Sequence, residues 1–188
     1  MTNAPATTSL TARPVTRGSS DYARIRGLMT TAFPEAEQMP MWLLRLMALR
    51  RNVEFSAMYD GDELCGVLYT VESERYVFVL YLATFPEVRS RGYGGRILDF
   101  VKERAGGRGV VLNVERPDET AANAEQRLRR VAFYARNGIV DTGRTFTDGG
   151  VEYAILSTDG PDIDMEAYGR LLRGMSFGLF GGSRRMGR

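Results

Sequence analysis

Residues 87–96 read Glu-Val-Arg-Ser-Arg-Gly-Tyr-Gly-Gly-Arg, and this stretch decides the fold. It follows a near-continuous apolar run at 76–84, which predicts a central strand covered on both faces. It precedes a helical pattern at 97–104. The glycines lack Cβ atoms, so backbone N–H groups can approach a ligand closely. The partial positive charge of a helix N-terminus and the full charges of Arg89, Arg91 and Arg96 complete a predicted pyrophosphate site.

Two other phosphate-binding patterns fit this stretch less well. No Gly-Lys-Ser/Thr follows the glycines, as the loop of phosphate-loop NTPases requires. The glycine spacing also differs from the dinucleotide fingerprint, and the preceding strands form hairpins rather than a parallel unit. A flexible glycine turn with solvated arginines is the remaining alternative.

The rest of the chain predicts a mixed α/β order. Strands are expected at 11–16, 53–59, 64–71, 76–84, 110–115, 139–142 and 151–157, and helices at 22–32, 41–51, 97–104, 124–136 and 164–172. Ser19, Ser20 and Asp21 offer N-caps for the first helix, and Pro34 ends it. Trp42 and the methionines of the second helix are expected to pack in the core, and the lining of a substrate cleft is the alternative.

The composition bounds the class of protein. The 188 residues are 44% hydrophobic and 26% charged, which is typical of a globular domain. The net charge of +2 is too balanced to indicate a nucleic-acid binder. The chain has no histidine, so histidine triads and histidine metal sites are excluded. The single cysteine, Cys65, excludes an intramolecular disulfide and a cysteine-cluster zinc site, so no metal is expected.

The location and the domain limits follow from the same reading. Residues 1–14 have neither a cationic start nor an apolar stretch, so no secretory signal is expected. No apolar run approaches the length of about 20 residues that spans a bilayer, and we expect a cytoplasmic protein with no membrane association. We expect a disordered leader over 1–10, one domain over 11–158, and a C-terminal helix with a Gly/Arg-rich tail over 159–188.

Two motifs resemble a known family. Residues 89–94, Arg-Ser-Arg-Gly-Tyr-Gly, resemble the Arg/Gln-x-x-Gly-x-Gly/Ala signature of the GNAT superfamily of acyl-CoA-dependent N-acyltransferases. Residues 83–88 are similar to that family's lead into the loop, and Ala-Phe-Tyr-Ala-Arg-Asn-Gly-Ile at 132–139 looks like its Phe-Tyr-x-x-x-Gly-Phe segment. The resemblance covers residues 11–157, and the two motifs stand in the family's order and separation.

The resemblance implies both a fold and a co-substrate. The fold would be an α/β (α+β) mixed sheet, splayed and mostly antiparallel, with helices on both faces. Acetyl-CoA would lie between the fourth and fifth strands. Its pyrophosphate would bind the loop formed by Arg89, Ser90, Arg91, Gly92, Tyr93, Gly94 and Gly95. Its pantetheine arm would pair with backbone of Leu82, Ala83 and Thr84 that a bulge in the central strand leaves exposed.

Two residues are candidates for the transfer step. In this family a tyrosine on the helix after the fifth strand often protonates the departing thiolate, and Tyr134 occupies the matching position. A phenol stays protonated at neutral pH and can donate to sulfur, while packing in the core is the alternative. Glu115, at the end of the fifth strand, is the candidate base acting through water. An ion pair at the surface with Arg116 or another arginine is its alternative role, and Glu72 and Glu74 are further candidates for the base.

One position departs from the family pattern. Many relatives carry an asparagine two turns before the tyrosine that contacts the cofactor, and Arg127 stands there in this chain. It belongs to the run Arg-Leu-Arg-Arg at 127–130, whose arginines either contact a phosphate of coenzyme A or are solvated.

The expected function is N-acetyl transfer from acetyl-CoA directly to a primary amine, on a small molecule or a peptide. Much of the rate would come from positioning. Cys65 lies outside both motifs, so we expect it in the core and expect no acyl-cysteine route. The walls of the acceptor pocket would come from the first two helices and the 144–150 loop, and their sequences do not identify the amine. The sequence also leaves open whether the protein forms a homodimer.

Two rival functions differ in class. An inactive acyl-CoA-binding sensor or scaffold would keep the cofactor loop but not the chemistry, and Tyr134 favours the enzyme over it. Nucleic-acid binding through the tail is the other rival. It would use the five arginines Arg170, Arg173, Arg184, Arg185 and Arg188. Arginines on a surface helix and in a C-terminal tail more often only interact with solvent, so we expect no nucleic-acid partner.

Overall fold

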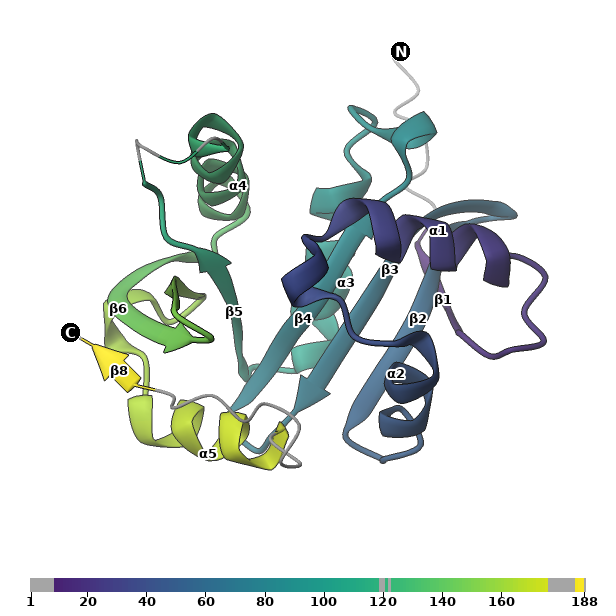
Figure 1. The fold of residues 1–188 in the computed structure, drawn as a ribbon. Coiled ribbons are helices and arrows are strands. Elements are labelled where there is room, and N and C mark those ends of the chain that lie inside the picture. The colour runs from purple at the N-terminus through teal and green to yellow at the C-terminus, as the bar shows by residue number, and fades with distance from the viewer. Residues whose placement is uncertain (1–8, 119–120, 122, 176–184, 188) are drawn as a thin grey trace, which may run out of the picture. The chain divides into compact units, whose positions relative to one another are not determined.

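The computed structural model describes residues 9–118, 121, 123–175 and 185–187 (Figure 1). Residues 1–8 of the expected leader, and residues 176–184 and 188 of the expected tail, lie outside these ranges. The chain divides into two compact units. Unit 1 comprises Met1–Thr70 and Tyr81–Phe100, and unit 2 comprises Val71–Leu80 and Val101–Arg188.

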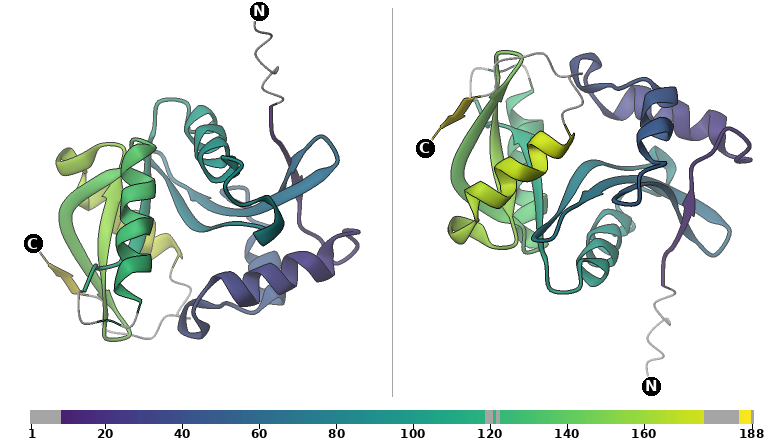
Figure 2. Two further views of the ribbon diagram at one scale, coloured as in Figure 1. Left: turned by 90° about the horizontal axis from the view of Figure 1, so that it is seen from above. Right: turned by 90° about the horizontal axis from the view of Figure 1, so that it is seen from below.

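Unit 1 has the strand order β1-β2-β3-β4. The elements that lie wholly or partly in it are β1 (Thr11–Pro14), α1 (Tyr22–Ala32), η1 (Glu35–Glu37), α2 (Met41–Met47), β2 (Val53–Asp60), β3 (Glu63–Glu72), β4 (Tyr76–Thr84), η2 (Pro86–Val88) and α3 (Tyr93–Ala105). Strands β1 and β2 are antiparallel, from Thr11↔Tyr59 to Pro14↔Ser56. Figure 2 shows α1 and α2 on one face of these strands and α3 on the other.

Helix α1 forms where the helical pattern predicts it. Its buried residues are Ile25, Leu28 and Met29, which follow the spacing of one helix face, and the helix ends before Pro34. Asp21, one of the three candidate caps, occupies the N-cap position, but its side chain makes no capping hydrogen bond. Its carboxylate instead accepts hydrogen bonds from the Tyr59 hydroxyl at 2.9 Å and from Arg24 at 3.2 Å. A tertiary contact has replaced the local one.

Three predictions about α2 and α3 are corrected. Helix α2 ends at Met47 rather than Arg51, because the chain must turn before β2 begins at Val53. Trp42 is 61% exposed and does not pack in the core, whereas Met47 is buried as predicted. Helix α3 begins at Tyr93 rather than Ile97, so two glycines stand in its first turn. Tertiary contacts thus override the low helix propensity of glycine here.

Unit 2 has the strand order β4-β5-β7-β6-β8. Besides parts of β3, β4 and α3, its elements are β5 (Gly109–Glu115), α4 (Ala124–Arg136), β6 (Val140–Asp148), β7 (Val151–Ser157), η3 (Gly160–Asp162), α5 (Met165–Met175) and β8 (Arg185–Gly187). Strands β4 and β5 are parallel, and the pairs β5/β7, β6/β7 and β6/β8 are antiparallel. The mostly antiparallel mixed sheet with helices confirms the predicted fold class.

Strand β6 runs further than predicted, to Asp148 instead of Thr142. Its pairing with β7 shifts register between Asp141 and Thr145, and Gly143 adopts a φ of 71° within this irregularity. A bulge of this kind lets a strand bend and continue past an unpaired residue. The short alternating pattern at 139–142 therefore ends at the bulge, whereas the strand does not. Among the described helices, none has the length and the apolar character needed to cross a membrane.

Candidate active site

The predicted loop has an unusual backbone. Ser90 has a φ of 63° and Gly92 a φ of 80°, both in the left-handed region. The first hydrogen bond of α3 runs from Arg96 N to Gly92 O at 3.2 Å. The N–H groups of residues 93–95 therefore find no partner inside the helix. A Cβ added at Gly92 would have no heavy atom within 4 Å, so the turn opens onto free space. This arrangement can bind an anion.

The strand that leads to this loop is held close to β3. A Cβ added at Gly66 would lie 2.6 Å from the backbone oxygen of Ala83, so only glycine allows this approach. The Phe85 N–H donates to the Cys65 carbonyl at 3.1 Å. Cys65 itself is fully buried, which confirms its expected place in the core. Its thiol donates to the Met58 carbonyl at 3.0 Å, and burial raises its pKa to about 11.

Two of the three loop arginines are ion-paired. Arg91 makes a bidentate pair with Glu63, with Nη1–Oε1 at 2.7 Å and Nη2–Oε2 at 2.8 Å. Arg96 Nη1 lies 2.6 Å from Asp60 Oδ2. Arg89, by contrast, is exposed. The charges of Arg91 and Arg96 are therefore offset by carboxylates of the β2–β3 hairpin, and the expectation that all three arginines face a pyrophosphate does not follow from this geometry.

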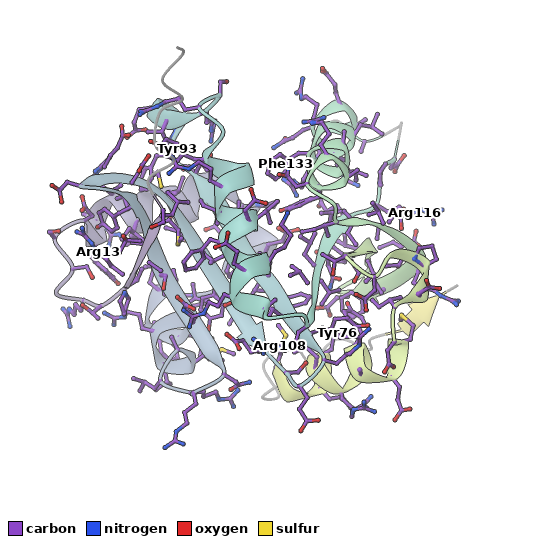
Figure 3. All side chains as sticks on the ribbon, turned by 180° about the vertical axis from the view of Figure 1, so that it is seen from behind. Arg13, Tyr76, Tyr93, Arg108, Arg116 and Phe133 are labelled. Atoms are coloured by element: carbon purple, nitrogen blue, oxygen red, sulfur yellow. The ribbon has the colours of Figure 1, made fainter. Side chains whose placement is uncertain are left out.

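Tyr93 connects the two ion pairs (Figure 3). Its hydroxyl lies 2.9 Å from Glu63 Oε2 and 3.1 Å from Asp60 Oδ2. The guanidinium carbons of Arg91 and Arg96 each lie 5.1 Å from the centre of its ring. The side chain is only 4% exposed. Burial, followed by the contacts with Glu63 and Asp60, raises the pKa of Tyr93 to about 12.

The segment between α1 and α2 is fastened to β4. The Tyr81 hydroxyl donates to the Glu37 carbonyl, and its ring lies edge-on to that of Phe33 with the centroids 4.8 Å apart. Gln38 Nε2 donates to the carbonyls of Thr30 and Phe33, both at 2.8 Å. Burial raises the pKa of Tyr81 to about 12. These contacts fix the course of residues 33–38 relative to the strand that carries Leu82.

Tyr134 lies in unit 2 and is the residue of α4 that is buried. Its side chain is 9% exposed, and its ring meets that of Phe133 at 5.2 Å in an edge-on arrangement. Within the described part of the chain, its hydroxyl has no hydrogen-bond partner. Burial raises the pKa of Tyr134, and the positive charge of Arg130 opposes this effect. The hydroxyl therefore stays protonated at neutral pH.

Glu115 forms the ion pair of its alternative role, and its partner is Arg127 rather than Arg116. Arg127 Nε lies 3.2 Å from Glu115 Oε2, and Asn123 Nδ2 donates to the same oxygen at 3.4 Å. Arg127 also donates to the Arg116 carbonyl at 3.0 Å. Arg116 instead pairs with Glu152 at 2.9 Å, at the end of β5 (Figure 3). Arg127 therefore holds the carboxyl end of β5.

The other candidate carboxylates differ from each other. Glu72 pairs with Arg108 at 2.8 Å and with Arg104 at 3.8 Å, whereas Glu74 is exposed.

The predicted site residues are divided between the two units. The loop residues 89–95 and the backbone of 82–84 belong to unit 1, and Tyr134 and Glu115 both belong to unit 2. Among the described residues, no group of three or more acidic or cysteine side chains could hold a metal ion.

Sequence reasoning missed the carboxylates that bind the loop arginines. Asp60 and Glu63 precede the loop by about thirty positions, and local pattern gives no sign of the pairing. The one available signal was the Asp60-Gly61 turn, which places charged residues at the end of a hairpin beside the central strand.

Comparisons with known proteins agree with one another. The sequence model of the Acetyltransferase (GNAT) family matches residues 22–139. The Bacillus subtilis (strain 168) protein named "Putative acetyltransferase YjbC" is 33% identical over 84 residues, which cover 44% of this chain and only 41% of that protein. A solved structure named "Putative acetyltransferase from GNAT family", from Bacteroides thetaiotaomicron, is 26% identical, with 92% of this chain and 99% of that chain covered and a TM-score of 0.67.

A further solved structure shares the fold at lower identity. It is a GNAT family acetyltransferase from Elizabethkingia anophelis with acetyl-CoA bound. It is 13% identical, the match covers 79% of this chain and 97% of that chain, and the TM-score is 0.55.

Proposed function

Because this chain belongs to the GNAT acetyltransferase family, we propose that it moves an acetyl group from acetyl-CoA directly to a primary amine. The observation that carries the proposal is the start of α3, where a glycine turn leaves three consecutive N–H groups without helical partners. The fold shared with the E. anophelis enzyme, which holds acetyl-CoA, supports the same co-substrate here.

The loop suits a pyrophosphate in both shape and charge. The N–H groups of residues 93–95 and the dipole of a 13-residue helix favour a negative ligand. Gly92 adds no side chain at the mouth of the turn, and a side chain there would also strain a backbone with a φ of 80°. Of the loop arginines, the exposed Arg89 is the one we assign to the phosphates.

The pantetheine arm would lie along β4. Within unit 2, the ladder between β4 and β5 consists of the pairs Tyr76↔Gly109, Val77↔Val110 and Phe78↔Val111, although both strands continue. An early end of a parallel ladder leaves strand backbone groups in need of partners. This supports the assignment of the backbone of Leu82, Ala83 and Thr84 to the amides of the pantetheine arm.

The transfer step needs a nucleophile and a departing thiol. The neutral amine attacks the thioester carbonyl carbon, and the adduct collapses with cleavage of the C–S bond. Tyr134 would donate its phenolic proton to the sulfur, so coenzyme A leaves as the thiol, and water returns a proton to the phenolate. The excess proton on the new amide nitrogen passes to solvent, directly or through a base. The raised pKa of Tyr134 suits an acid that must hold its proton at neutral pH.

Glu115 remains a candidate for that base, acting through a water molecule. Its contacts with Arg127 and Asn123 favour a different role, in which the carboxylate holds the end of β5. The two roles predict different pH dependence in a Glu115→Gln variant, which is described in the Discussion.

The experiment that tests the function combines binding with turnover. Calorimetric titration with acetyl-CoA measures binding, and thiol release against a panel of amines measures transfer. Gly92→Asp should abolish binding, because it places a negative charge beside the pyrophosphate. Gly92→Asn is the matched control, since asparagine has the same shape, tolerates the left-handed backbone and carries no charge. It should bind far better than Gly92→Asp.

The outcomes separate the rival functions. Binding with thiol release for at least one amine supports the transferase. Binding without thiol release for any amine favours the acyl-CoA sensor. Equal affinity of the wild type, Gly92→Asp and Gly92→Asn would show that the loop does not hold the pyrophosphate.

A further inference from the structure

We propose that Asp60 and Glu63, on the β2–β3 hairpin, are positioning residues that pre-organise the 89–95 loop for coenzyme A. Arg91 and Arg96 then act through these carboxylates and not on the phosphates. The inference rests on the proposed function, and it assigns to the hairpin a role that no family motif contains.

The geometry of Arg91 is the first argument. A guanidinium recognises a carboxylate or a phosphate through its fork of parallel N–H groups. Both terminal nitrogens of Arg91 already point at the two oxygens of Glu63, at 2.7 and 2.8 Å. A phosphate could occupy this same fork of N–H groups only if the bidentate pair opened. Arg96 is likewise engaged by Asp60 at 2.6 Å.

The position of Tyr93 is the second argument. It is the first residue of α3, so its placement sets the direction of the N–H groups that follow it. The guanidinium groups of Arg91 and Arg96 both contact its buried ring, and its hydroxyl reaches both hairpin carboxylates. The hairpin is therefore attached to the loop just before the helix, at its first residue and one turn later.

The glycines explain why such attachment matters. A turn with Gly92, Gly94 and Gly95 is conformationally free, and ordering it on binding would cost affinity. Contacts that order the loop beforehand remove that cost from the binding step. Both carboxylates are ionised at neutral pH, because the hydrogen bond from Arg96 lowers the pKa of Asp60 and the hydrogen bond from Arg91 lowers the pKa of Glu63.

The two possible roles of Glu63 predict opposite changes in the affinity for coenzyme A when its charge is removed. If Glu63 only competes with a phosphate for Arg91, then removal of its charge frees the arginine and tightens binding of coenzyme A. If Glu63 positions the loop, the same change weakens binding. Glutamine has the shape of glutamate but cannot form the charged bidentate pair, so Glu63→Gln tests the sign directly.

The experiment is a double-mutant cycle on the full chain with coenzyme A as the probe. Calorimetric titration gives the Kd of the wild type, Glu63→Gln, Arg91→Gln and the double variant. We expect each single variant to bind about fivefold more weakly, and the double variant to be no weaker than either. Asp62→Asn is the matched control, because Asp62 is fully exposed on the same hairpin and contacts Arg13, outside the loop. Its Kd should equal that of the wild type.

Two further readouts distinguish positioning from general damage. In steady-state kinetics, Glu63→Gln should raise the KM for acetyl-CoA more than it lowers kcat. In the free protein, hydrogen exchange of the Arg96 amide, which donates to the Gly92 carbonyl at 3.2 Å and so closes the turn, should be faster in Glu63→Gln and Asp60→Asn than in the wild type or Asp62→Asn. The second readout needs no bound ligand, so it tests the inference even if the wild type binds no coenzyme A.

Failure of the inference and failure of the proposed function are therefore separate results. Unchanged or tighter binding in Glu63→Gln, additive losses in the double variant, or unchanged exchange of the Arg96 amide would overturn the inference. A wild type that binds no coenzyme A would instead overturn the proposed function.

Discussion

Arg127 Nε lies 3.2 Å from Glu115 Oε2 at the carboxyl end of β5, with the two side chains only 19% and 13% exposed. Arg127 stands where many relatives, by the resemblance described above, carry an asparagine. Through the same guanidinium it reaches the carbonyl of Arg116. The departure from the family pattern is thus compensated within unit 2 by a carboxylate and a backbone oxygen.

This ion pair gives a prediction for Glu115→Gln. Loss of the charge leaves a half-buried arginine poorly paired, so the free energy of unfolding should fall by about 1–3 kcal/mol. If Glu115 is structural, kcat should fall by no more than a few-fold at every pH. A loss of 100-fold or more, confined to the acid side of the profile, would identify Glu115 as the base. Glu152→Gln is the control, because it breaks the exposed pair with Arg116.

Gly66 gives a prediction for the course of β4. In Gly66→Ala, the new Cβ would meet the Ala83 oxygen at 2.6 Å and Ile97 Cδ1 at 3.0 Å. Backbone cannot yield cheaply, so we expect a loss of about 1–3 kcal/mol in the free energy of unfolding and weaker binding of acetyl-CoA. Gly27→Ala is the control, since it lies in α1 with no atom within 4 Å of the new Cβ. It should be neutral or stabilising by up to about 1 kcal/mol. Equal effects of the two substitutions in urea unfolding would contradict the contact.

Tyr81 gives a prediction for the dependence of stability on pH. Burial raises its pKa to about 12, above the ordinary value of about 10 for tyrosine. Between these values the unfolded chain loses the proton and the folded protein keeps it. The stabilisation linked to this raised pKa is therefore complete below about pH 10 and is lost as the pH rises towards 12. Tyr81→Phe should be less stable than the wild type at pH 8, because the bond to Glu37 is lost. Its stability should also fall less between pH 10 and 11. If the stability of Tyr81→Phe falls as steeply between pH 10 and 11 as that of the wild type, Tyr81 is not a source of this pH dependence.

Local pattern predicted the elements that depend on local causes. The apolar run of β4 and the amphipathic pattern of α4 gave strand and helix bounds that the structure confirms at Tyr76–Thr84 and Ala124–Arg136. The start of α3 was missed because glycines carry no helix signal, and contacts of Tyr93 with a distant hairpin decide it. Trp42 was misplaced because its apolar character alone does not say which face of α2 is buried.

The site was predictable to a similar extent. The glycine turn could be located from its spacing, but the pairing of Arg91 with Glu63 and of Glu115 with Arg127 could not. The sequence offers 23 acidic residues as partners for these arginines, and only the fold selects among them. Charge pairs between segments distant in sequence are therefore the part of the site that a single sequence leaves open.

The most direct test of the proposed transfer is the turnover of Tyr134→Phe. Phenylalanine keeps the ring and its packing and removes the proton donor. General-acid steps contribute about 10²–10⁴-fold, and a coenzyme A thiolate is a fair leaving group, so kcat should fall by a factor near the lower end. Because burial raises the pKa of Tyr134, its hydroxyl keeps the proton and the deficit should be constant from about pH 7 to 9. The Kd of acetyl-CoA should change little, since the hydroxyl acts in the transition state.

Tyr168→Phe is the matched control for this measurement. Tyr168 is a buried tyrosine of the same unit whose hydroxyl donates to Asn113 Oδ1 at 2.8 Å. Its loss should lower the free energy of unfolding by about 1 kcal/mol and leave kcat within a few-fold of the wild type. We expect kcat to fall roughly 100-fold in Tyr134→Phe, at unchanged Kd for acetyl-CoA. Wild-type kcat in Tyr134→Phe, measured with an amine that the wild-type protein acetylates, would contradict it.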